Sequence, residues 1–351
     1  MAPVLLFTGC VNRPLSYAPA ASGKGIASFF VDEQTGAARA GEIYTDIVNP
    51  TFVAISPDGT RLAAVSETED QPEGSLSLFD IDRATGGLSL RGSQPTGGDV
   101  ACHCGFDVSG DMLGAANYSI GNPGRGHAVS IHRFAATELG PSLAAIVHTG
   151  SGPNAERQER SHAHCIRWTP DNRHFAIVDL GIDQVRLYRA SDFTLSAAAS
   201  LPSGSGPRHI AFHPSKPFAY VMSELASGVT TFASADGRLE LIATEPVVPS
   251  IPGGSGIIVA PSGRHLFAGD RGGRTIARFT IDPVTGVARF AGAVACGGDG
   301  PRDLALSPSG TVLAVANVMS NNVALFRHAT DGTLTPLASI ATGTPTGVAF
   351  A

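Results

Sequence analysis

The chain has 351 residues, of which 43% are hydrophobic and only 15% are charged, and its formal net charge is −6. This hydrophobic content supports a large buried core, while the lack of a basic surplus argues against binding to nucleic acid. No apolar run approaches the roughly 18 residues of a membrane span, so neither nucleic acid nor a membrane is expected as a partner.

The first predicted element is a β-strand over residues 4–10, with the sequence VLLFTGC. It resembles a lipoprotein cleavage box, but it lacks a positively charged segment before it, and the apolar stretch is too short for a signal peptide. An odd number of cysteines without an export signal is typical of a reduced protein. We therefore expect a cytoplasmic location. The five cysteines are Cys10, Cys102, Cys104, Cys165 and Cys296.

Two repeated signatures follow along the chain. In the first, an apolar residue is followed three positions later by an aromatic residue, and successive aromatics are 44 to 55 residues apart. Turn pairs such as Thr35-Gly36 and Asp331-Gly332 come after most of them, so each occurrence predicts an outer β-hairpin. The seven aromatics are Phe29, Phe79, Phe134, Tyr188, Phe232, Phe279 and Phe326.

The second signature is an alternating apolar run, a turn rich in Pro, Asp, Ser and Gly, and another alternating run, which predicts an inner hairpin. Six such turns occur, at 56–59, 108–110, 169–172, 213–216, 260–263 and 307–310. Seven outer hairpins require a seventh inner one, and the two ends of the chain supply it. Residues 346–350 resemble the first strand of an inner hairpin, and residues 4–10 resemble the second.

The sequence therefore predicts an all-β fold, a seven-bladed β-propeller with four antiparallel strands per blade, as one domain over residues 1–351. One C-terminal strand, placed at Val348 to Ala351, and three N-terminal strands form a split blade, which covers two otherwise open sheet edges. No stretch keeps a 3.6-residue period over three turns, so long helices are not expected. Six or eight blades would require one hairpin signature to be spurious or missed.

In a radial arrangement of antiparallel hairpins, the start of each first strand and the end of each second strand meet at one mouth of the channel. These positions are unusually polar for a chain with so few charges, which is typical of a binding pocket. The candidates before first strands are His103, His162, His164, Arg208 and Arg302; those after second strands are Glu67, Asn117, Asp179, Glu224, Asp270, Arg271 and Asn317.

Some of these residues also fit structural roles. Asn117, Asp179 and Asn317 suit turns and caps at blade ends, and an Arg–Glu pair is equally compatible with a tie between blades. The pair His162 and His164 provides too few ligands for a metal site without further partners. No cofactor is therefore expected; a divalent metal remains possible, but we expect activity to survive a chelator.

The chain is similar to the seven-bladed propeller lactonases, which include propeller-type 6-phosphogluconolactonases and fungal carboxy-cis,cis-muconate lactonizing enzymes. The resemblance covers nearly the whole chain and is most specific in the loop 150–164, which ends in His162-Ala163-His164. It extends to the segments Gly206-Pro207-Arg208-His209, Ser223-Glu224-Leu225, Asp270-Arg271-Gly272 and Gly300-Pro301-Arg302-Asp303.

The resemblance implies a catalytic group of His162, His164, Arg208, Glu224 and Arg271. The other candidates at the mouth, which we expect to bind substrate, are His103, Glu67, Asp270, Arg302, Asn117 and Asp179. Two segments depart from the family pattern. Gly9-Cys10-Val11 stands for the usual Gly-Thr-Tyr, and Asp270-Arg271-Gly272 stands for Asn-Arg-Gly, which adds a carboxylate to the mouth.

We therefore expect a lactone hydrolase acting on an anionic or sugar-derived lactone in carbohydrate metabolism. Its reaction needs an activated water, a stabiliser for the oxyanion and an acid for the leaving alkoxide. Glu224, His162 and His164 are all candidates for the general base. A muconate-type cycloisomerase would use the same groups, and a non-catalytic protein-binding propeller would favour a broad exposed face instead. Both monomer and homodimer are compatible with the sequence.

Overall fold

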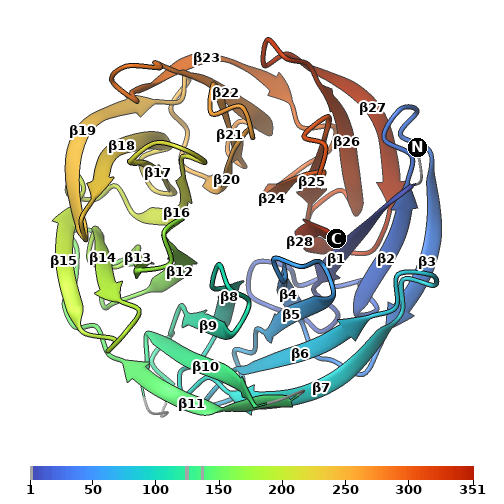
Figure 1. Cartoon of the computed structure of the whole chain (residues 1–351), viewed down its shortest axis with the longest axis horizontal. Helices are drawn as coiled ribbons and strands as arrows, with labels where there is room; N and C mark the ends of the chain where they lie inside the picture. The colour runs from blue at the N-terminus through green and yellow to red at the C-terminus, as the bar shows by residue number, and fades with distance from the viewer. Residues whose placement is uncertain (1–2, 123–125, 136–137) are drawn as a thin grey trace.

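The computed structural model describes residues 3–122, 126–135 and 138–351. These residues form 28 strands in seven antiparallel sheets of four, arranged as blades around a channel (Figure 1). Within the described part of the chain there is no helix, and therefore none that could cross a membrane. The predicted seven-bladed β-propeller is confirmed.

Each blade has an inner strand next to the channel and a second strand paired to it. The inner strands are β28 (Pro345–Phe350), β4 (Pro50–Ile55), β8 (Ala101–Phe106), β12 (Ala163–Trp168), β16 (Pro207–Phe212), β20 (Gly254–Val259) and β24 (Pro301–Leu306). The second strands are β1 (Val4–Cys10), β5 (Arg61–Ser66), β9 (Met112–Asn117), β13 (His174–Asp179), β17 (Phe218–Ser223), β21 (His265–Asp270) and β25 (Val312–Asn317).

Two outer strands complete each blade. The third strands are β2 (Ile26–Val31), β6 (Ser75–Ile81), β10 (Val129–Ala135), β14 (Gln184–Arg189), β18 (Gly228–Ala235), β22 (Thr275–Ile281) and β26 (Asn322–His328). The fourth strands are β3 (Ala38–Tyr44), β7 (Leu88–Pro95), β11 (Glu138–Ile146), β15 (Leu195–Ser200), β19 (Arg238–Pro246), β23 (Ala288–Ala295) and β27 (Leu334–Ala341).

Burial follows from these positions. Second strands such as β9, β13 and β25 are buried along their whole length, because blades pack on both of their faces. Fourth strands such as β23 alternate between exposed and partly covered residues, as expected for a strand on the rim. The seven aromatics of the outer-hairpin signature all fall on third strands, as predicted.

The split blade joins the two ends of the chain. β28 pairs antiparallel with β1, with Thr8 opposite Val348 and Phe7 opposite Ala349, and Figure 1 shows the C-terminus beside β1. This closure is the one predicted, except that β28 spans Pro345–Phe350 rather than Val348 to Ala351. The extra residues belong to a bulge at the start of the strand, where the register shifts between Gly9 and Cys10.

The same bulge recurs in every blade. The inner strand pairs through its first residue, skips at least the second, and resumes pairing one register later. A bulge leaves the extra residue unpaired and redirects its side chain. The second residues of the seven inner strands are Thr346, Thr51, Cys102, His164, Arg208, Ser255 and Arg302.

This register corrects one expectation. We predicted His164, Arg208 and Arg302 just before the first strands, whereas they are the second residues of β12, β16 and β24, and His103 is the third residue of β8. The reason is that the bulge brings the second residue of an inner strand to the mouth.

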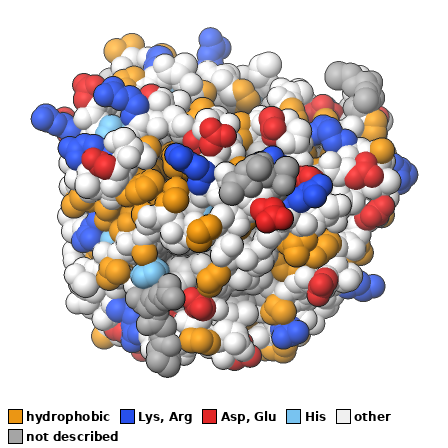
Figure 2. Space-filling model, turned by 60° about the horizontal axis from the view of Figure 1, so that its bottom comes forward, with side chains coloured by type: hydrophobic (Ala, Val, Ile, Leu, Met, Phe, Trp, Pro, Cys, Tyr) orange, Lys and Arg blue, Asp and Glu red, His pale blue; other side chains and the backbone are white. Residues whose placement is uncertain are grey.

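On the outer surface, Figure 2 shows acidic and basic side chains interspersed over the face it presents.

Candidate active site

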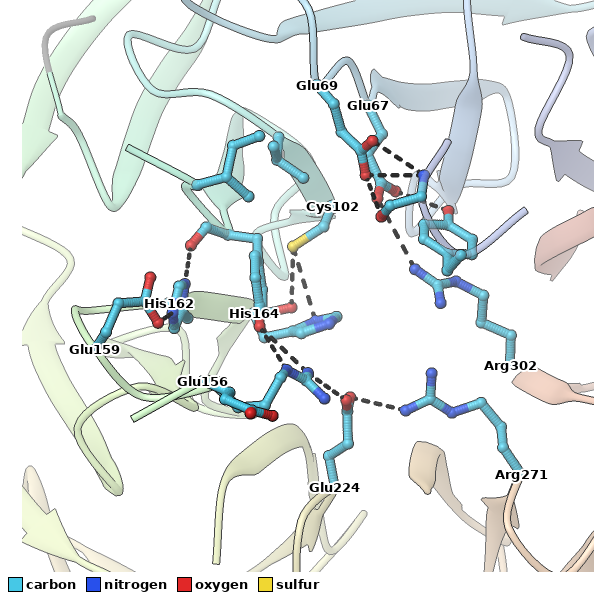
Figure 3. A pocket seen from close by; sticks show the side chains of 16 residues that line it. Glu67, Glu69, Cys102, Glu156, Glu159, His162, His164, Glu224, Arg271 and Arg302 are labelled. Carbon is cyan, nitrogen blue, oxygen red and sulfur yellow. Dashed lines mark hydrogen bonds and ion pairs between the residues drawn. The ribbon is translucent and has the colours of Figure 1, made fainter. Parts of the chain in front are cut away.

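A polar cavity of about 360 Å³ lies at the mouth where the inner strands begin (Figure 3). Loops that follow β1, β5, β9 and β11 contribute to its walls together with the starts of the inner strands. It is lined by Ser16, Tyr17, Glu67, Glu69, Val100, Cys102, Tyr118, Ile120, Glu156, Arg157, Glu159, His162, His164, Glu224, Arg271 and Arg302.

Glu224, directly after β17, is the electrostatic centre of the site. Its Oε1 is 2.6 Å from Nη2 of Arg157, and its Oε2 is 2.9 Å from Nη2 of Arg271 and 3.0 Å from Nε of Arg208. The Nε–H of Arg208 is not aligned as a hydrogen bond, so that contact is Coulombic. Burial alone would raise the pKa of Glu224, but Arg271 and Arg208 outweigh it and hold that pKa far below its usual range.

The three arginines differ in how far they reach the cavity. The exposed fraction of the side chain is 40% for Arg157, 24% for Arg271 and 3% for Arg208. Arg208 does not line the cavity but lies behind Glu224. Burial, followed by repulsion from Arg271 and Arg302, lowers the pKa of Arg208 to about 10, which still leaves it charged at neutral pH.

Arg302 stands apart from this cluster. Its guanidinium lies over the ring of Tyr17, 3.9 Å from the centroid, and its only ion pair within the described part of the chain is a loose one of 4.0 Å to Oε1 of Glu67. The Tyr17 hydroxyl donates to Oε2 of Glu67 at 3.2 Å. Among the described residues Arg302 therefore has no hydrogen-bond acceptor, and its donors remain available to a ligand.

His162 has both ring nitrogens occupied. Nδ1 is 2.8 Å from the Tyr118 carbonyl oxygen and 2.9 Å from that of Ser119, and Nε2 is 3.1 Å from Oε2 of Glu159. The ring also stacks on that of Tyr118, with centroids 4.2 Å apart. The imidazole is thus fixed in place and has no free nitrogen for a proton from water.

His164 differs in this respect. Its Nδ1 is 3.7 Å from Sγ of Cys102, and Nε2 has no hydrogen-bond partner among the described residues. Burial, followed by Coulombic repulsion from Arg208, holds the pKa of His164 well below its usual range, so the ring is neutral at pH 7. Burial also raises the pKa of Cys102, which keeps the thiol protonated.

The buried pair of Asp179 and His148 holds the backbone of the segment that carries His162. Oδ2 of Asp179 is 2.7 Å from Nδ1 of His148 and accepts from the Ser161 hydroxyl at 2.5 Å. Its Oδ1 accepts from the backbone N–H of His162 at 2.8 Å. Nε2 of His148 is 3.0 Å from the Tyr188 hydroxyl. Asp179 thus positions the loop that carries His162 and does not itself reach the cavity.

We therefore expect Asp179→Asn to destabilise the protein by about 2 kcal/mol. One carboxylate oxygen that now accepts hydrogen bonds would become an amide nitrogen, which cannot accept them. The variant should also raise KM, since the loop with His162 loses its anchor. Thermal unfolding and steady-state kinetics on the same preparation measure both effects. A variant with unchanged kinetics would show that Asp179 contributes only to the fold.

Four other candidates lie outside the cavity. Asn117 donates to the carbonyl oxygens of Thr96 and His127, and Asp270 accepts from the hydroxyl of Ser227, so each caps the end of a second strand. His103 lies deeper in the channel, stacked on Phe52 at 4.0 Å. Asn317, which donates to the Cys296 carbonyl oxygen, is also a cap.

The structure also adds residues that sequence reasoning did not single out. Arg157 lies inside the motif 150–164, but only its contact with Glu224 reveals its place. Tyr118 is the first residue after β9, and Glu69 is the third residue after β5. Both therefore lie beyond the strand-end candidates Asn117 and Glu67. Ser16 is brought to the mouth by hydrogen bonds from its backbone N–H and its hydroxyl to the Glu69 carboxylate.

No group of three or more His, Cys, Asp or Glu side chains in the described part of the chain is arranged to hold a metal ion. The carboxylate at the centre of the site is already surrounded by arginines, which would repel a cation. The site instead offers positive charge, one neutral imidazole with a free nitrogen and several carboxylates at its rim.

A propeller whose channel mouth holds such a cavity defines a class of protein: a β-propeller with a small-molecule active site. The family model described as "Lactonase, 7-bladed beta-propeller" matches residues 6–350. The chain belongs to the seven-bladed β-propeller lactonase family.

Relatives of known name agree with this assignment. The 6-phosphogluconolactonase of Bacillus subtilis is 33% identical over 331 residues, covering 90% of this chain and 91% of its own length. Among solved structures, a putative 6-phosphogluconolactonase from Bacteroides fragilis has a TM-score of 0.89 at 28% identity, covering 100% of this chain and 98% of that chain. A periplasmic gluconolactonase from Pseudomonas aeruginosa has a TM-score of 0.87 at 26% identity, covering 99% and 98%. The chain is a lactone hydrolase of 6-phosphogluconolactonase-like type.

Proposed function

We propose that this lactonase hydrolyses a sugar-derived lactone that carries an anionic group, as the name of its 6-phosphogluconolactonase relatives indicates for them. The observation that carries the proposal is the state of Arg302. Its guanidinium lines the cavity and is held over Tyr17, and its one ion pair with the residues that the structure describes is loose, at 4.0 Å. A fixed guanidinium with free donors suits a phosphate or carboxylate.

We assign the general base to His164. The Cys102 thiol lies 3.7 to 3.8 Å from three backbone carbonyl oxygens and can donate to any one of them. Its sulfur then accepts Nδ1–H of His164, which leaves Nε2 free to take a proton from water. Glu224 is a poor base because both of its carboxylate oxygens are already held by the guanidinium groups of Arg157, Arg208 and Arg271. His162 has no free nitrogen.

In the proposed reaction, the water oxygen attacks the lactone carbonyl carbon while its proton passes to Nε2 of His164. The guanidinium of Arg271 and the positive field of the buried Arg208 stabilise the oxyanion. Collapse of this intermediate breaks the ring C–O bond, and the imidazolium returns the proton to the leaving alkoxide. The product is a hydroxy acid, whose carboxyl group releases one proton to solvent at neutral pH.

The two alternatives are less well supported. A cycloisomerase would use the same cavity, but the named relatives are lactonases. A protein-binding propeller would not need a buried carboxylate with three arginines in a small cavity. Proton release on a panel of lactones, followed at constant pH with and without a strong chelator, tests the proposal directly.

We expect phosphorylated sugar lactones to be the best substrates in this panel and the chelator to leave the rate unchanged. Turnover of muconates, followed by their ultraviolet absorbance, in the absence of lactone hydrolysis would overturn the proposed direction. Loss of activity with chelator and recovery with one divalent metal would move His162, His164 and Glu224 into ligand roles.

Arg302→Ala is expected to raise KM for a phosphorylated lactone by about ten- to a hundredfold. This is the loss in binding expected when one or two charge-assisted hydrogen bonds are removed. KM for the matching unphosphorylated lactone should change little, because that substrate lacks the anionic group. Arg302→Lys serves as the control that keeps the charge. An equal rise in KM for both substrates would remove Arg302 from the role of anion anchor.

We further propose that the protein works in a reducing, cytoplasmic compartment, as a monomer or a homodimer. All five cysteines are free and buried in the structure, which suits a compartment where thiols stay reduced. Fractionation with a compartment marker and light scattering on purified protein test the two parts separately.

A further inference from the structure

A second and larger cavity of about 570 Å³ occupies the opposite end of the channel. Its walls are the later residues of the inner strands, and none of its lining residues also lines the active-site cavity. The lactonase reaction does not use it. Its charged lining residues are Asp107, Arg167 and Asp303.

Asp107 is accounted for by the fold, whereas the other two charges are not. Asp107 accepts hydrogen bonds from the Ser109 hydroxyl, the Asn172 amide and the Met112 backbone N–H, and so closes a hairpin turn. Arg167 and Asp303 have no ion pair within 4 Å among the described residues. Arg167 makes no hydrogen bond through its side chain in the described part of the chain either.

Both charged side chains have small neighbours. Asp303 is the third residue of β24, and the third residues of the adjacent inner strands are Gly256 and Gly347. A carboxylate oxygen of Asp303 lies 3.0 Å from where a Cβ on Gly256 would stand. Arg167 is the fifth residue of β12, and its counterparts in β8 and β16 are Gly105 and Ala211. These small neighbours leave room for each charge within the channel.

The carboxylate of Asp303 is held in place and ionised. Oδ2 accepts the backbone N–H of Val348 at 3.1 Å. Burial raises the pKa of Asp303 to about 6, so the group is mostly charged at neutral pH. Arg167 acts on Asp303 through its charge without pairing with it. β12 and β24 lie across the channel from each other (Figure 1).

The walls of the cavity also carry apolar side chains. These apolar side chains include those of Phe52, Phe212, Ile258 and Phe350. His209, at the inner end, has a pKa well below its usual range because of burial, followed by repulsion from Arg208, so it adds no positive charge. The cavity thus offers an anion on one side, a cation on the other and apolar surface between them.

We propose that this second opening of the channel binds a small zwitterion, an amino acid with an apolar side chain. Its ammonium group pairs with Asp303, its carboxylate with Arg167, and its side chain lies on the apolar wall. Asp303 is buried without a cationic partner among the described residues, whereas Arg167 is exposed at the opening of the cavity. The ligand would therefore supply the cation that Asp303 lacks and place its carboxylate next to Arg167. This inference does not rest on the proposed lactone substrate, because it concerns a separate cavity.

Trp168, the only tryptophan of the chain, lines this cavity and not the active site. L-Leucine is titrated into the intact protein, and binding is followed by Trp168 fluorescence and by calorimetry. The matched probes are N-acetyl-L-leucine, which lacks the ammonium group, and L-leucinamide, which lacks the carboxylate. We expect saturable binding of L-leucine with a Kd on the order of 1 mM and at least tenfold weaker binding of either blocked probe.

Two variants locate the site. Asp303→Asn keeps an acceptor for the Val348 N–H but removes the charge, and Arg167→Gln removes the cation. Each should weaken L-leucine binding at least tenfold while leaving lactone hydrolysis unchanged.

The proposal is overturned if neither method detects saturable binding up to about 50 mM L-leucine. Equal binding by the wild type and both variants would also overturn it, as would displacement of L-leucine by the hydroxy-acid product of lactone hydrolysis. These outcomes are independent of whether the lactone assay succeeds.

Discussion

Replacing His164 by glutamine is expected to lower kcat for lactone hydrolysis by roughly a thousandfold, within the range found for a lost general base. Glutamine keeps a polar side chain of similar reach but cannot take a proton from water. The ring of His164 makes a weak hydrogen-bonding contact with Cys102 and edge contacts with the rings of Tyr118 and His209. Because these contacts are weak, thermal stability should change little. Initial rates and unfolding curves are to be measured on the same purified protein.

Two further substitutions sharpen this test. His162→Gln should mainly raise KM, since the ring of His162 is fixed between Tyr118 and Glu159. His265→Gln is the matched control, because this ring lies near His328, away from the active site. If His162→Gln lowered kcat more than His164→Gln, the role of general base would pass to His162.

The pH dependence follows from the state of His164. Its pKa lies well below its usual range, so the neutral, proton-accepting form is already complete at pH 6.5. After subtraction of spontaneous hydrolysis, kcat/KM should be constant between about pH 6.5 and 8 and fall only at lower pH. An acid limb centred near pH 7 would contradict the assignment.

Glu224→Gln is expected to destabilise the fold by about 3 to 5 kcal/mol. The glutamine side chain fits the same space, but Arg157, Arg208 and Arg271 lose their shared counter-charge. Most of the cost comes from Arg208, which is buried, since solvent screens the two more exposed arginines. Chemical denaturation with urea measures the change.

A surface pair and a double variant serve as controls. Arg274→Gln breaks the exposed pair of Arg274 with Asp299 and should cost about 1 kcal/mol or less. Adding Arg208→Met to Glu224→Gln should recover part of the lost stability, because the buried cation is then removed as well. Additive losses in the double variant would show that Arg208 and Glu224 are not coupled.

The contribution of Glu224 to stability also has a defined pH range. Its folded-state pKa is lowered, so the stabilisation is complete above the unfolded-state value of about 4.3. It is lost only as the pH falls through the folded-state pKa, far into the acid range. The difference in stability between wild type and Glu224→Gln should therefore be constant from pH 8 to 5.

The blade architecture was predictable because each hairpin has its own signature. The aromatics of the third strands and the turns of the inner hairpins repeat at similar spacing, so counting them was enough to find seven blades and the split one. The exact start of the inner strands was not predictable. A bulge depends on the pairing register, and it interrupts the alternation of apolar and polar residues that marks a strand in the sequence.

The candidate site was predictable only in part. Positions at strand ends led to Glu67, Glu224 and Arg271, since topology alone brings such positions to the mouth. Arg157 and Tyr17 come from loops, whose paths are set by contacts with Glu224 and Arg302 that no local pattern records. Asn117 and Asp270 share the same strand-end positions but face blade contacts, a difference that only side-chain direction reveals.

The seam in the split blade bears on how the protein folds. The hydroxyl of Thr8 bonds to the carbonyl oxygen of Gly347, 339 positions along the chain. Contacts between such distant segments form slowly, because the loop between them must first be ordered.

During synthesis, the inner edge of β1 therefore stays unpaired until β28 has been made. An open strand edge of this kind invites pairing with other chains. The hydrophobic strand VLLFTGC, which is buried almost throughout in the finished ring, is thus open to wrong pairing during this time. Correct closure depends on β28 arriving before another chain occupies that edge.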